Sequence, residues 1–526
     1  MGMYLNPGNS GFTSIRNDLY IDKSGLIGLI NETIETPRRL TCVSRPRRFG
    51  KSFAAKMLCA YYDKTCDSAC LFDDLSIAAD AETYRQHLNK YDVIYLDMTS
   101  VMEEAGEIEL ISFIKRELIR ELSLACPQLK PEGPFLTALL EAVELTGSKF
   151  IMIIDEWDAP IRETPENEKK YLHFLRSMFK SSAATDRIFA AVYMTGILPV
   201  KKDGSQSAIS DFQEFSMLKP RQFADYVGFL ENEVKGLCKR YCCDFDQMNF
   251  WYDGYTFRGV KSVYNPNSVI KAVRNHDFDS YWTETSAAQS LMEYIGLDFD
   301  GLSGTVAELL GGGNVKINTA GFANDLVTFR GRDDVLTLLI HLGYLAYDTE
   351  TGTVRIPNEE IRLEFARTIR EVKRDDTIRR VRESDRLIED TIHRKEEAVA
   401  AQIEKIHAEE APLHYNNEQS LRSVLKRAYF SYGDEYILFE ELPSGVGYAD
   451  MVYLPKKDSV LPALVIELKW NQAAKGAIAQ IRNRQYFKAI ENYGGEILLV
   501  GIAYDKNAPA GERRHTCIIE AYHKGV

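Results

Sequence analysis

The sequence lacks the marks of an exported or membrane-bound protein. Its start, Met1–Gly11, has no basic residues followed by an apolar run, so we expect no signal peptide. No stretch approaches the roughly 18 consecutive apolar residues of a membrane span. The nine cysteines have no repeating spacing that would indicate a disulfide framework or a metal site. We therefore expect a cytoplasmic protein with reduced thiols and no membrane partner.

An excess of positive charge is also missing. The formal net charge of −13 at pH 7 argues against a surface broadly adapted to nucleic acid, so any contact with DNA or RNA would come from local patches. The hydrophobic fraction of 45% and the charged fraction of 27% are typical of a soluble globular protein. A chain of 526 residues exceeds one ordinary core, so we expect two or three domains.

The hydrophobic pattern of the first part predicts an α/β fold. Short apolar runs alternate with stretches of helical periodicity, as in a parallel sheet covered by helices. This sheet would occupy residues 1–200, and an aromatic-rich helical region would follow over residues 201–358. The expected strands are Leu40–Val43, Val93–Leu96, Phe150–Ile154 and Phe189–Met194, and the expected helices include Ile108–Leu124 and Lys169–Phe179.

A charged segment precedes the last part of the chain. Residues 359–410 mix Arg, Lys, Asp and Glu with apolar residues at helical spacing. Because the charges are of both signs, we prefer a solvated helical connector over a nucleic-acid-binding arm. Residues 411–526 predict a small α/β domain with one helix, Glu418–Tyr429, before its strands. These strands are expected at Tyr436–Phe439, Asp450–Leu454, Leu464–Trp470 and Ile497–Ile502.

A candidate phosphate-binding loop follows the first strand and leads into an expected helix, Phe53–Tyr62. A strand, a tight loop ending in Gly-Lys-Ser and a helix form the context that a P-loop requires. Lys51 would reach the β/γ oxygens of ATP, and the Ser52 hydroxyl would bind Mg²⁺. Arg45 stands where the usual motif has its first glycine. The residues expected to contact the nucleotide are Arg45, Pro46, Arg47, Arg48, Phe49, Gly50, Lys51 and Ser52.

Two acidic residues follow the third strand. Phe150–Ile154 ends in Asp155 and Glu156, at the edge of an open α/β sheet where ligands bind. Asp155 would hold Mg²⁺ directly or through water, and Glu156 could polarise the attacking water. An acidic turn after a strand is the alternative, but the presence of Lys51 and Ser52 upstream favours an ATPase site.

Other polar residues of this region each have two interpretations. Thr195 follows the fourth strand and could sense the γ-phosphate or belong to a simple turn. Arg47 and Arg48 could contact phosphate or face solvent. Arg187 could act in trans as an arginine finger if the protein forms a homo-oligomer, although we prefer a solvated arginine.

An acid and a base share one face of a strand in the last domain. Side chains alternate along a strand, so Glu467 and Lys469 project from the same face, about 6–7 Å apart. Asp450 heads the preceding strand, with 16 residues between it and Glu467. The two carboxylates could hold a divalent cation that activates a water, while Lys469 orients this water or neutralises the developing charge. A structural salt bridge is the alternative for Glu467 and Lys469.

The helix expected after this strand, Gly476–Ile490, carries further candidates. Gln480 could point at the metal site, and Arg484 or Lys488 at a phosphate. These residues would complete a compact site for cutting a phosphodiester bond.

Several segments together match a known family. They are Tyr20–Ser24, Ser44–Ser52, Ile154–Pro160, Thr195–Pro199, Trp251–Tyr255, Val263–Pro266, Gly447–Asp450, Ile466–Lys469 and Gln480–Ile481. Over nearly its whole length the chain resembles the bacterial and archaeal AAA-ATPase-like proteins that carry a C-terminal PD-(D/E)XK nuclease domain. The resemblance implies a P-loop NTPase sheet followed by a restriction-endonuclease-like domain, and ATP and Mg²⁺ as cofactors.

The resemblance also implies one further metal ligand and reveals one departure. Glu418, on the first helix of the last domain, would be an additional acidic residue near the metal. The family's usual Gly-Arg-x-Asp reads Gly447-Tyr448-Ala449-Asp450 here. The metal ligands are retained, whereas a possible substrate or structural contact of the missing arginine is in doubt.

Three functional hypotheses follow. The leading one is an ATP-binding and ATP-hydrolysing protein coupled to a Mg²⁺-dependent nuclease that acts on DNA or RNA. The first alternative is an NTP-switched interaction protein whose nuclease-like domain binds nucleic acid without cleaving it. The second alternative is an ATPase with a purely structural tail. The presence of Asp450, Glu467 and Lys469 together favours the nuclease.

Overall fold

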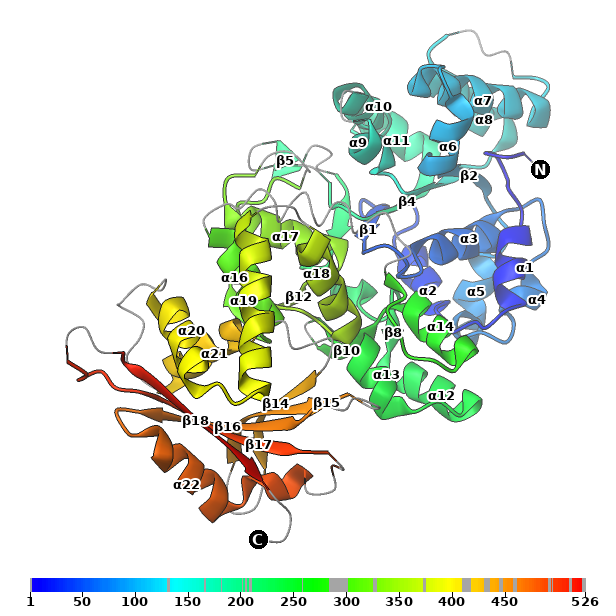
Figure 1. The fold of residues 1–526 in the computed structure, drawn as a ribbon. Coiled ribbons are helices and arrows are strands. Elements are labelled where there is room, and N and C mark those ends of the chain that lie inside the picture. Colours follow the sequence, from blue (N-terminus) through cyan, green and yellow to red (C-terminus); the bar gives the residue numbers. More distant parts are fainter. Residues whose placement is uncertain are drawn as a thin grey trace. The chain divides into compact units, whose positions relative to one another are not determined.

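The protein, seen in a computed structural model, divides into two compact units (Figure 1). The first comprises Met1–Tyr281 and Lys316–Asn358, and the second comprises Trp282–Val315 and Glu359–Val526. The structure describes residues 2–129, 133–164, 167–180, 182–200, 202–203, 206–207, 211–257, 259–282, 301–324, 329–371, 375–408, 418–429, 436–443, 448–456, 461–490, 493, 495–509 and 513–522.

The first unit is built on a parallel five-stranded sheet in the order β2-β3-β4-β1-β7. Its strands are β1 Leu40–Ser44, β2 Asp92–Asp97, β3 Phe150–Asp155, β4 Phe189–Gly196 and β7 Gln213–Phe215. The four predicted strands are confirmed, each longer than expected by a residue or two. β7 was not predicted, because three residues are too few to show a strand pattern.

Helices lie on both faces of this sheet. α3 packs against β3 and β4 on one face, while the other face joins α6, α7, α8 and α10 in the main apolar core. The expected helices are confirmed as α3, α7 and α10. The helices of this part are α1 Ser10–Arg16, α2 Gly25–Asn31, α3 Lys51–Tyr62, α4 Ala69–Phe72, α5 Ala81–His87, α6 Met98–Ala105, α7 Leu110–Ala125, α8 Phe135–Thr146, α9 Ala159–Glu163, α10 Glu168–Phe179 and α11 Ser182–Ile188.

The rest of the first unit is mixed rather than purely helical. A three-stranded sheet in the order β8-β10-β9 packs with α12, α13 and α14 around a second core rich in tyrosine. The elements of this region are β8 Phe229–Leu230, α12 Glu231–Tyr241, α13 Phe245–Tyr252, β9 Tyr255–Phe257, β10 Val260–Tyr264, α14 Pro266–Asn275, α17 Arg332–Leu342, β12 Ala346–Asp348 and β13 Thr353–Arg355. β11 Val315–Lys316 has one residue in each unit, and β5 Lys202–Asp203 and β6 Gln206–Ser207 form a short hairpin.

The second unit contains a mixed sheet in the order β14-β15-β16-β17-β18, in which only β16 and β17 are parallel. The strands are β14 Tyr436–Pro443, β15 Tyr448–Pro455, β16 Ala463–Trp470, β17 Ile497–Tyr504 and β18 His515–Tyr522. Four of them were predicted. β18 was not, because its apolar residues are interrupted by charged and polar ones and its pairing with β17 is the main reason for its extended form.

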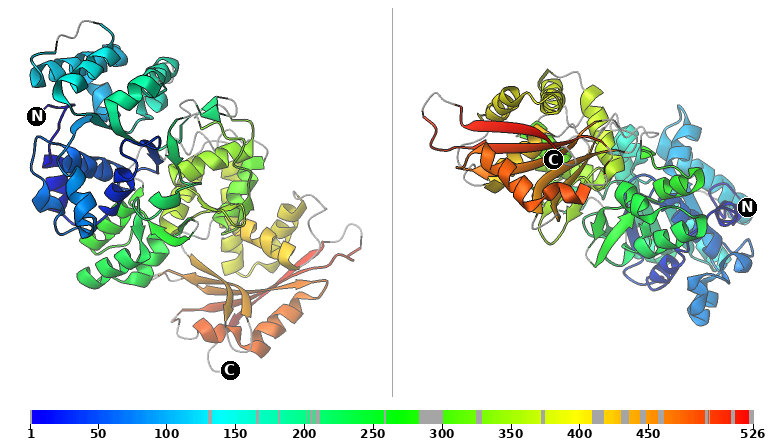
Figure 2. Two further views of the ribbon diagram at one scale, coloured as in Figure 1. Left: turned by 180° about the vertical axis from the view of Figure 1, so that it is seen from behind. Right: turned by 60° about the horizontal axis from the view of Figure 1, so that its bottom comes forward.

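Helices cover both faces of this sheet as well (Figures 1 and 2): α22 lies on one face, and α19, α20 and α21 lie on the other. The bounds are α16 Leu302–Leu310, α18 Glu359–Glu371, α19 Asp375–Ile392, α20 Glu396–Ala408, α21 Glu418–Ala428 and α22 Ala474–Arg484.

Two expectations about these helices need correction. In its described parts the segment 359–410 is helical, but it is not a solvated connector, because Leu387, Val399 and Ile403 are fully buried in the core of the second unit. The helix expected over Gly476–Ile490 ends at Arg484, where Gln485 adopts a left-handed conformation with a φ of 54°. A 3₁₀ helix, Tyr486–Ile490, follows.

All nine cysteines are free thiols. None of the helices in the described part of the chain combines the length and the apolarity that a membrane crossing requires.

Candidate active sites

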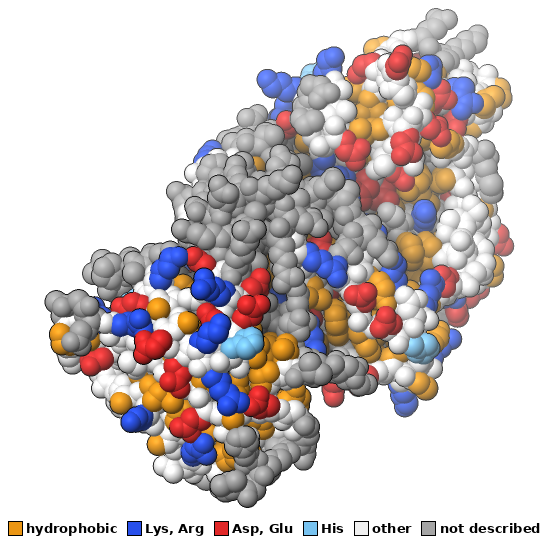
Figure 3. Space-filling model, in the orientation of Figure 1, with side chains coloured by type: hydrophobic (Ala, Val, Ile, Leu, Met, Phe, Trp, Pro, Cys, Tyr) orange, Lys and Arg blue, Asp and Glu red, His pale blue; other side chains and the backbone are white. Residues whose placement is uncertain are grey.

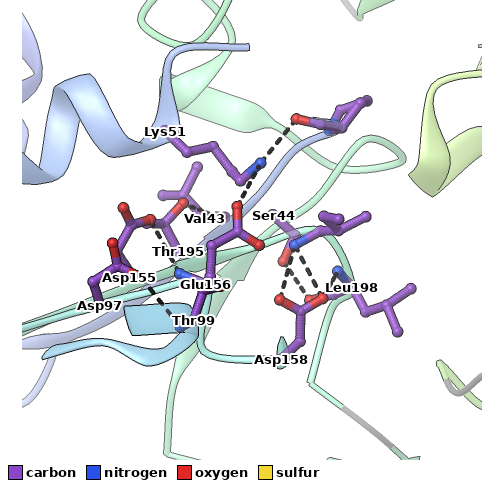
Figure 4. Close-up of polar contacts among 12 residues, drawn as sticks. Val43, Ser44, Lys51, Asp97, Thr99, Asp155, Glu156, Asp158, Thr195 and Leu198 are labelled. Carbon is purple, nitrogen blue, oxygen red and sulfur yellow. Dashed lines mark hydrogen bonds and ion pairs between the residues drawn. The ribbon is translucent and has the colours of Figure 1, made fainter. Parts of the chain in front are cut away.

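The carboxyl ends of β2 and β3 bring two acidic residues together. The parallel register pairs Asp97 with Asp155, and Glu156 follows directly (Figure 4). On the other side of β4, strand β1 leads into the phosphate-binding loop, so the loop and the acidic edge lie at the same end of the sheet. The spacing in sequence predicted Asp155 and Glu156. Asp97 was missed, although an acid directly after the apolar run Val93–Leu96 is the same signal.

The phosphate-binding loop ends at the N-terminus of a helix. Gly50 has a φ of 88°, which is favourable only for glycine, and α3 starts at Lys51. The Lys51 ammonium is almost fully buried and donates to the carbonyl of Pro46 over 2.9 Å. It also lies 3.5 Å from Oε1 of Glu156 (Figure 4). The structure thus joins the lysine of the loop to the glutamate after β3.

Asp155 is a buried carboxylate suited to a cation. Its Oδ1 accepts the backbone N–H of Glu156 over 3.0 Å, and Oδ2 has no hydrogen-bond partner within the described part of the chain. Burial raises the pKa of Asp155 to about 7, with the nearby Ser52 side chain and Lys51 opposing the rise and Glu156 and Asp97 adding to it. A divalent cation between Ser52 and Asp155 would remove this desolvation penalty, so these residues fit Mg²⁺.

Glu156 is held in a strained conformation by its neighbours. Its φ of 49° is uncommon outside glycine and costs of order 1–3 kcal/mol. Its Oε2 lies 2.9 Å from the Arg162 guanidinium, which also donates to Asp158 over 3.1 Å. Arg162 therefore fixes the position of the glutamate side chain relative to the protein core.

Asp158 anchors this arrangement. It is fully buried and accepts the backbone N–H groups of Ile197 and Leu198, just after β4 (Figure 4). Gly196 permits the approach, because a Cβ there would stand 2.4 Å from the Asp158 carboxylate. Sequence reasoning assigned no role to Asp158 or Arg162. The contact of Asp158 with the backbone after β4 joins segments that are separate in the sequence, whereas Arg162 lies one helical turn after Asp158.

In the ATPase that the sequence predicts, Arg162→Met should slow ATP turnover roughly 10- to 100-fold, because Glu156 would lose its alignment with the attacking water while the nucleotide contacts persist. Steady-state hydrolysis and fluorescent ATP-analogue binding would measure the two effects. Arg116→Met removes an exposed arginine and is the control, with turnover as in the unaltered protein. An equal loss of nucleotide affinity in Arg162→Met would contradict a positioning role.

The side chains of Arg45 and Phe49, in the same loop, are buried in the protein. The Arg45 guanidinium is fully buried and donates to the carbonyls of Ser44, Phe215 and Phe223, and burial lowers its pKa to about 10. The Phe49 ring is buried edge-on against Tyr255. Their side chains hold the loop in shape, so a nucleotide contact from Arg45 or Phe49 would come from the backbone.

Four further candidates lie in different surroundings. Arg48 donates to the carbonyl of Tyr281 over 3.3 Å, and Arg47 is half-buried. The Thr195 hydroxyl is buried and donates to the carbonyl of Val43 over 3.0 Å, which ties β4 to β1. Arg187 is exposed, pairs with Glu144 over 2.7 Å and precedes β4, at the opposite end of that strand from Thr195.

The second candidate site lies where the hydrogen-bonded pairing of β15 and β16 ends. Their ladder runs over Met451–Tyr453, and Asp450 just beyond it accepts the backbone N–H of Leu468 through Oδ2, over 2.9 Å. Oδ1 of Asp450 lies 2.5 Å from the Arg422 guanidinium. The carboxylate of Asp450 is thus placed beside the strand segment that carries Glu467 and Lys469.

Glu467 is the centre of a buried polar group. Its Oε1 accepts from the Lys469 ammonium over 3.0 Å and from the amide of Gln480 on α22. The same Gln480 amide donates to the Tyr486 hydroxyl over 3.2 Å. α22 comes this close because Gly501 on β17 has no side chain, since a Cβ there would stand 2.7 Å from the carbonyl of Ala474. The structure therefore brings Asp450, Glu467, Lys469 and Gln480 together, as the spacing predicted.

This oxygen-rich site fits a hard divalent cation. Two buried carboxylates from neighbouring strands are the ligands that Mg²⁺ prefers. Within the described ranges, no group of three or more His, Cys, Asp or Glu side chains could hold a metal ion, so Asp450 and Glu467 stand as a pair. Glu418 is the first residue of α21, and its side chain lies outside the described part, as does Gly447.

Comparisons with known proteins found family models for both parts of the chain. Residues 7–205 match the family model of a predicted AAA-ATPase, and residues 416–510 match the PD-(D/E)XK nuclease superfamily. The two matches lie in the order that the sequence predicted, an AAA-ATPase-like part followed by a PD-(D/E)XK superfamily part. Lys51, Ser52 and Asp155 fall in the AAA-ATPase-like part, and Asp450 and Glu467 fall in the nuclease-superfamily domain.

Individual relatives are distant. An uncharacterised protein in the vnfD 5′ region of Azotobacter chroococcum mcd 1 is 24% identical over 284 residues, which are 52% of each chain, so the match spans about half of that relative. A signal transduction ATPase with numerous domains and a tetratricopeptide repeat sensor, from Pyrococcus horikoshii, is 12% identical over 78% of this chain and 48% of its own, with a TM-score of 0.28. The ORC2 protein of Aeropyrum pernix is 14% identical over 67% of this chain and 96% of its own, with a TM-score of 0.28. Nothing about function follows from likenesses at this level.

Proposed function

We propose that this protein binds and hydrolyses ATP in its first unit and cleaves DNA or RNA, with a divalent cation, in its second. The observation that supports the ATPase most directly is the meeting of Lys51, Ser52, Asp155 and Glu156 at one end of the parallel sheet. The corresponding support for the nuclease is the meeting of Asp450, Glu467 and Lys469 at the fork of β15 and β16.

In the proposed ATPase, each side chain has a defined task. Lys51 exchanges its contact with the Pro46 carbonyl for the β/γ-phosphate oxygens. Ser52 and Asp155 would hold Mg²⁺, which supplies neutralising charge to the phosphate oxygens when bound. Glu156 orients and polarises the attacking water, and Arg162 keeps its carboxylate in position.

In the proposed nuclease, Asp450 and Glu467 would hold the divalent cation through their carboxylate oxygens. Lys469 donates to the attacking water or to the scissile phosphate, and Gln480 keeps Glu467 oriented towards the site. On the face of the molecule shown in Figure 3, described cationic side chains of the second unit are interspersed with anionic ones. Phosphate contact through a few local cations, rather than a broad basic surface, is consistent with this mixture.

Metal removal tests the proposal as a whole. Purified full-length protein is expected to hydrolyse ATP and to cut nucleic acid with Mg²⁺ or Mn²⁺, and excess EDTA should stop both reactions because each site needs an oxygen-bound cation. Released phosphate and fragments on a denaturing gel are the two readouts. Turnover of ATP or cleavage that persists in EDTA, and fails to respond to added Mg²⁺, would refute the corresponding site.

A further inference from the structure

One arginine occupies a place that the proposed nuclease needs for its cation. Arg422 lies on α21, and its Nη2 is 2.5 Å from Oδ1 of Asp450. The other carboxylate oxygen, Oδ2, accepts the backbone N–H of Leu468. Both oxygens of Asp450 therefore already have donors, and a cation that binds to Oδ1 must displace the guanidinium.

The two ion pairs that the structure describes at this site balance in charge without a metal. Asp450 and Glu467 contribute two negative charges, and Arg422 and Lys469, each in direct contact with one of them, contribute two positive charges. The exposed fractions of these side chains are 21% for Arg422, 11% for Asp450, 11% for Lys469 and 3% for Glu467. Burial makes unpaired charge costly, so the arginine stabilises Asp450 when no cation is bound.

A divalent cation changes this balance by two positive charges. With Asp450 bound to the cation, the Arg422 guanidinium gives up its contact with Oδ1 and lies beside an electropositive site. The group that restores neutrality there is the phosphate backbone of a nucleic acid. A guanidinium binds phosphate oxygens through paired N–H donors, so Arg422 carries the group that suits this contact.

We propose that Arg422 exchanges partners during the nuclease cycle: it holds Asp450 in the metal-free protein and contacts a phosphate of the nucleic acid once the cation is bound. This inference rests on the proposed nuclease function. It adds a phosphate-binding residue and makes the binding of metal and of nucleic acid mutually dependent through one side chain.

Opposite effects of one substitution test this exchange. Arg422→Gln removes the guanidinium that competes with the metal for Asp450. Calorimetric titration of the full-length variant should therefore show Mn²⁺ binding at least roughly tenfold tighter than in the unaltered protein. The same substitution should weaken binding of short fluorescein-labelled DNA and RNA strands and duplexes, measured by anisotropy with Mn²⁺, by roughly tenfold. The anisotropy measurements use the Lys469→Ala background, so that no cleavage occurs during the titration.

Two variants serve as matched comparisons. Lys426→Gln removes another cation from α21, one that pairs with Glu440 over 2.5 Å, and should change neither affinity. Arg422→Lys retains a positive charge and should bring both affinities part of the way back to those of the unaltered protein. Thermal unfolding of each variant shows whether it is folded.

The outcomes separate this exchange from the nuclease assignment. A parallel loss of Mn²⁺ and nucleic-acid affinity in Arg422→Gln would mean that the arginine only supports Asp450, and would overturn the exchange. If Mn²⁺ binding is lost in Asp450→Asn but its affinity is unchanged in Arg422→Gln, the exchange alone is overturned. Mn²⁺ binding that is unaffected by Asp450→Asn would overturn the proposed metal site together with the exchange.

Discussion

Asp450→Asn should reduce metal-dependent cleavage of nucleic acid by roughly a thousandfold or more, because the loss of an anionic ligand removes several kcal/mol of charge stabilisation at the scissile phosphate. The amide retains a carbonyl oxygen for the Leu468 N–H, so the local backbone contact is conserved. Initial rates of fragment formation at saturating Mn²⁺ are the measurement.

A matched control comes from the same domain. Asp505 is exposed, just after β17, and its carboxylate accepts a local backbone N–H. Asp505→Asn should cleave at the rate of the unaltered protein. ATP turnover in Asp450→Asn should also be unchanged, since Asp155 and Lys51 are intact. Cleavage that survives Asp450→Asn would show that these carboxylates are not the nuclease centre.

Lys51→Ala should abolish ATP hydrolysis, a loss of roughly a thousandfold or more, since the buried ammonium is the direct partner of the transferred phosphate in the proposed site. Phosphate release at saturating ATP measures the effect. Glu156→Gln should differ in kind: turnover is lost while ATP binding persists, because the amide cannot polarise the attacking water.

The exposed lysine on the same helix provides the comparison. Lys56 follows Lys51 on α3, and Lys56→Ala should hydrolyse ATP normally. Unchanged turnover in Lys51→Ala would refute the P-loop assignment. Loss of ATP binding in Glu156→Gln would argue that Glu156 supports the loop structurally through its contact with Lys51.

The sequence predicted the parts of both sites that depend on local pattern. Strands β3 and β16 are apolar runs that end in or carry acids, and a buried strand gives such acids a defined edge or face. Gly50 and Lys51 likewise follow from the strand–loop–helix context of the phosphate loop. These residues could be assigned because each motif fixes its own geometry within a few positions.

Contacts between distant segments could not be predicted in this way. Arg422 reaches Asp450 because α21 packs on the sheet, and Asp158 accepts from the N–H groups of Ile197 and Leu198, which follow another strand. The burial of Arg45 could not be predicted either, because an arginine in a phosphate loop suggests contact with phosphate. The buried guanidinium donates to the carbonyls of Phe215 and Phe223, which lie more than 150 positions away in the sequence.

The charged segment 359–410 shows the same limit. Its mixed charges favour solvent, yet Leu387 and Ile403 are fully buried against the nuclease-like sheet. A helix needs only one apolar stripe to join a core, and the sequence does not tell which surface that stripe meets.

The most direct test of the central claim is a cleavage screen of single- and double-stranded DNA and RNA, with Mg²⁺ or Mn²⁺, in the presence and absence of ATP. We predict cleavage of at least one substrate that requires the metal, disappears in Asp450→Asn and changes in rate when ATP is added. Stable binding of nucleic acid without cleavage of any substrate, in every metal and nucleotide condition, would contradict a nuclease and point to a protein that only binds nucleic acid.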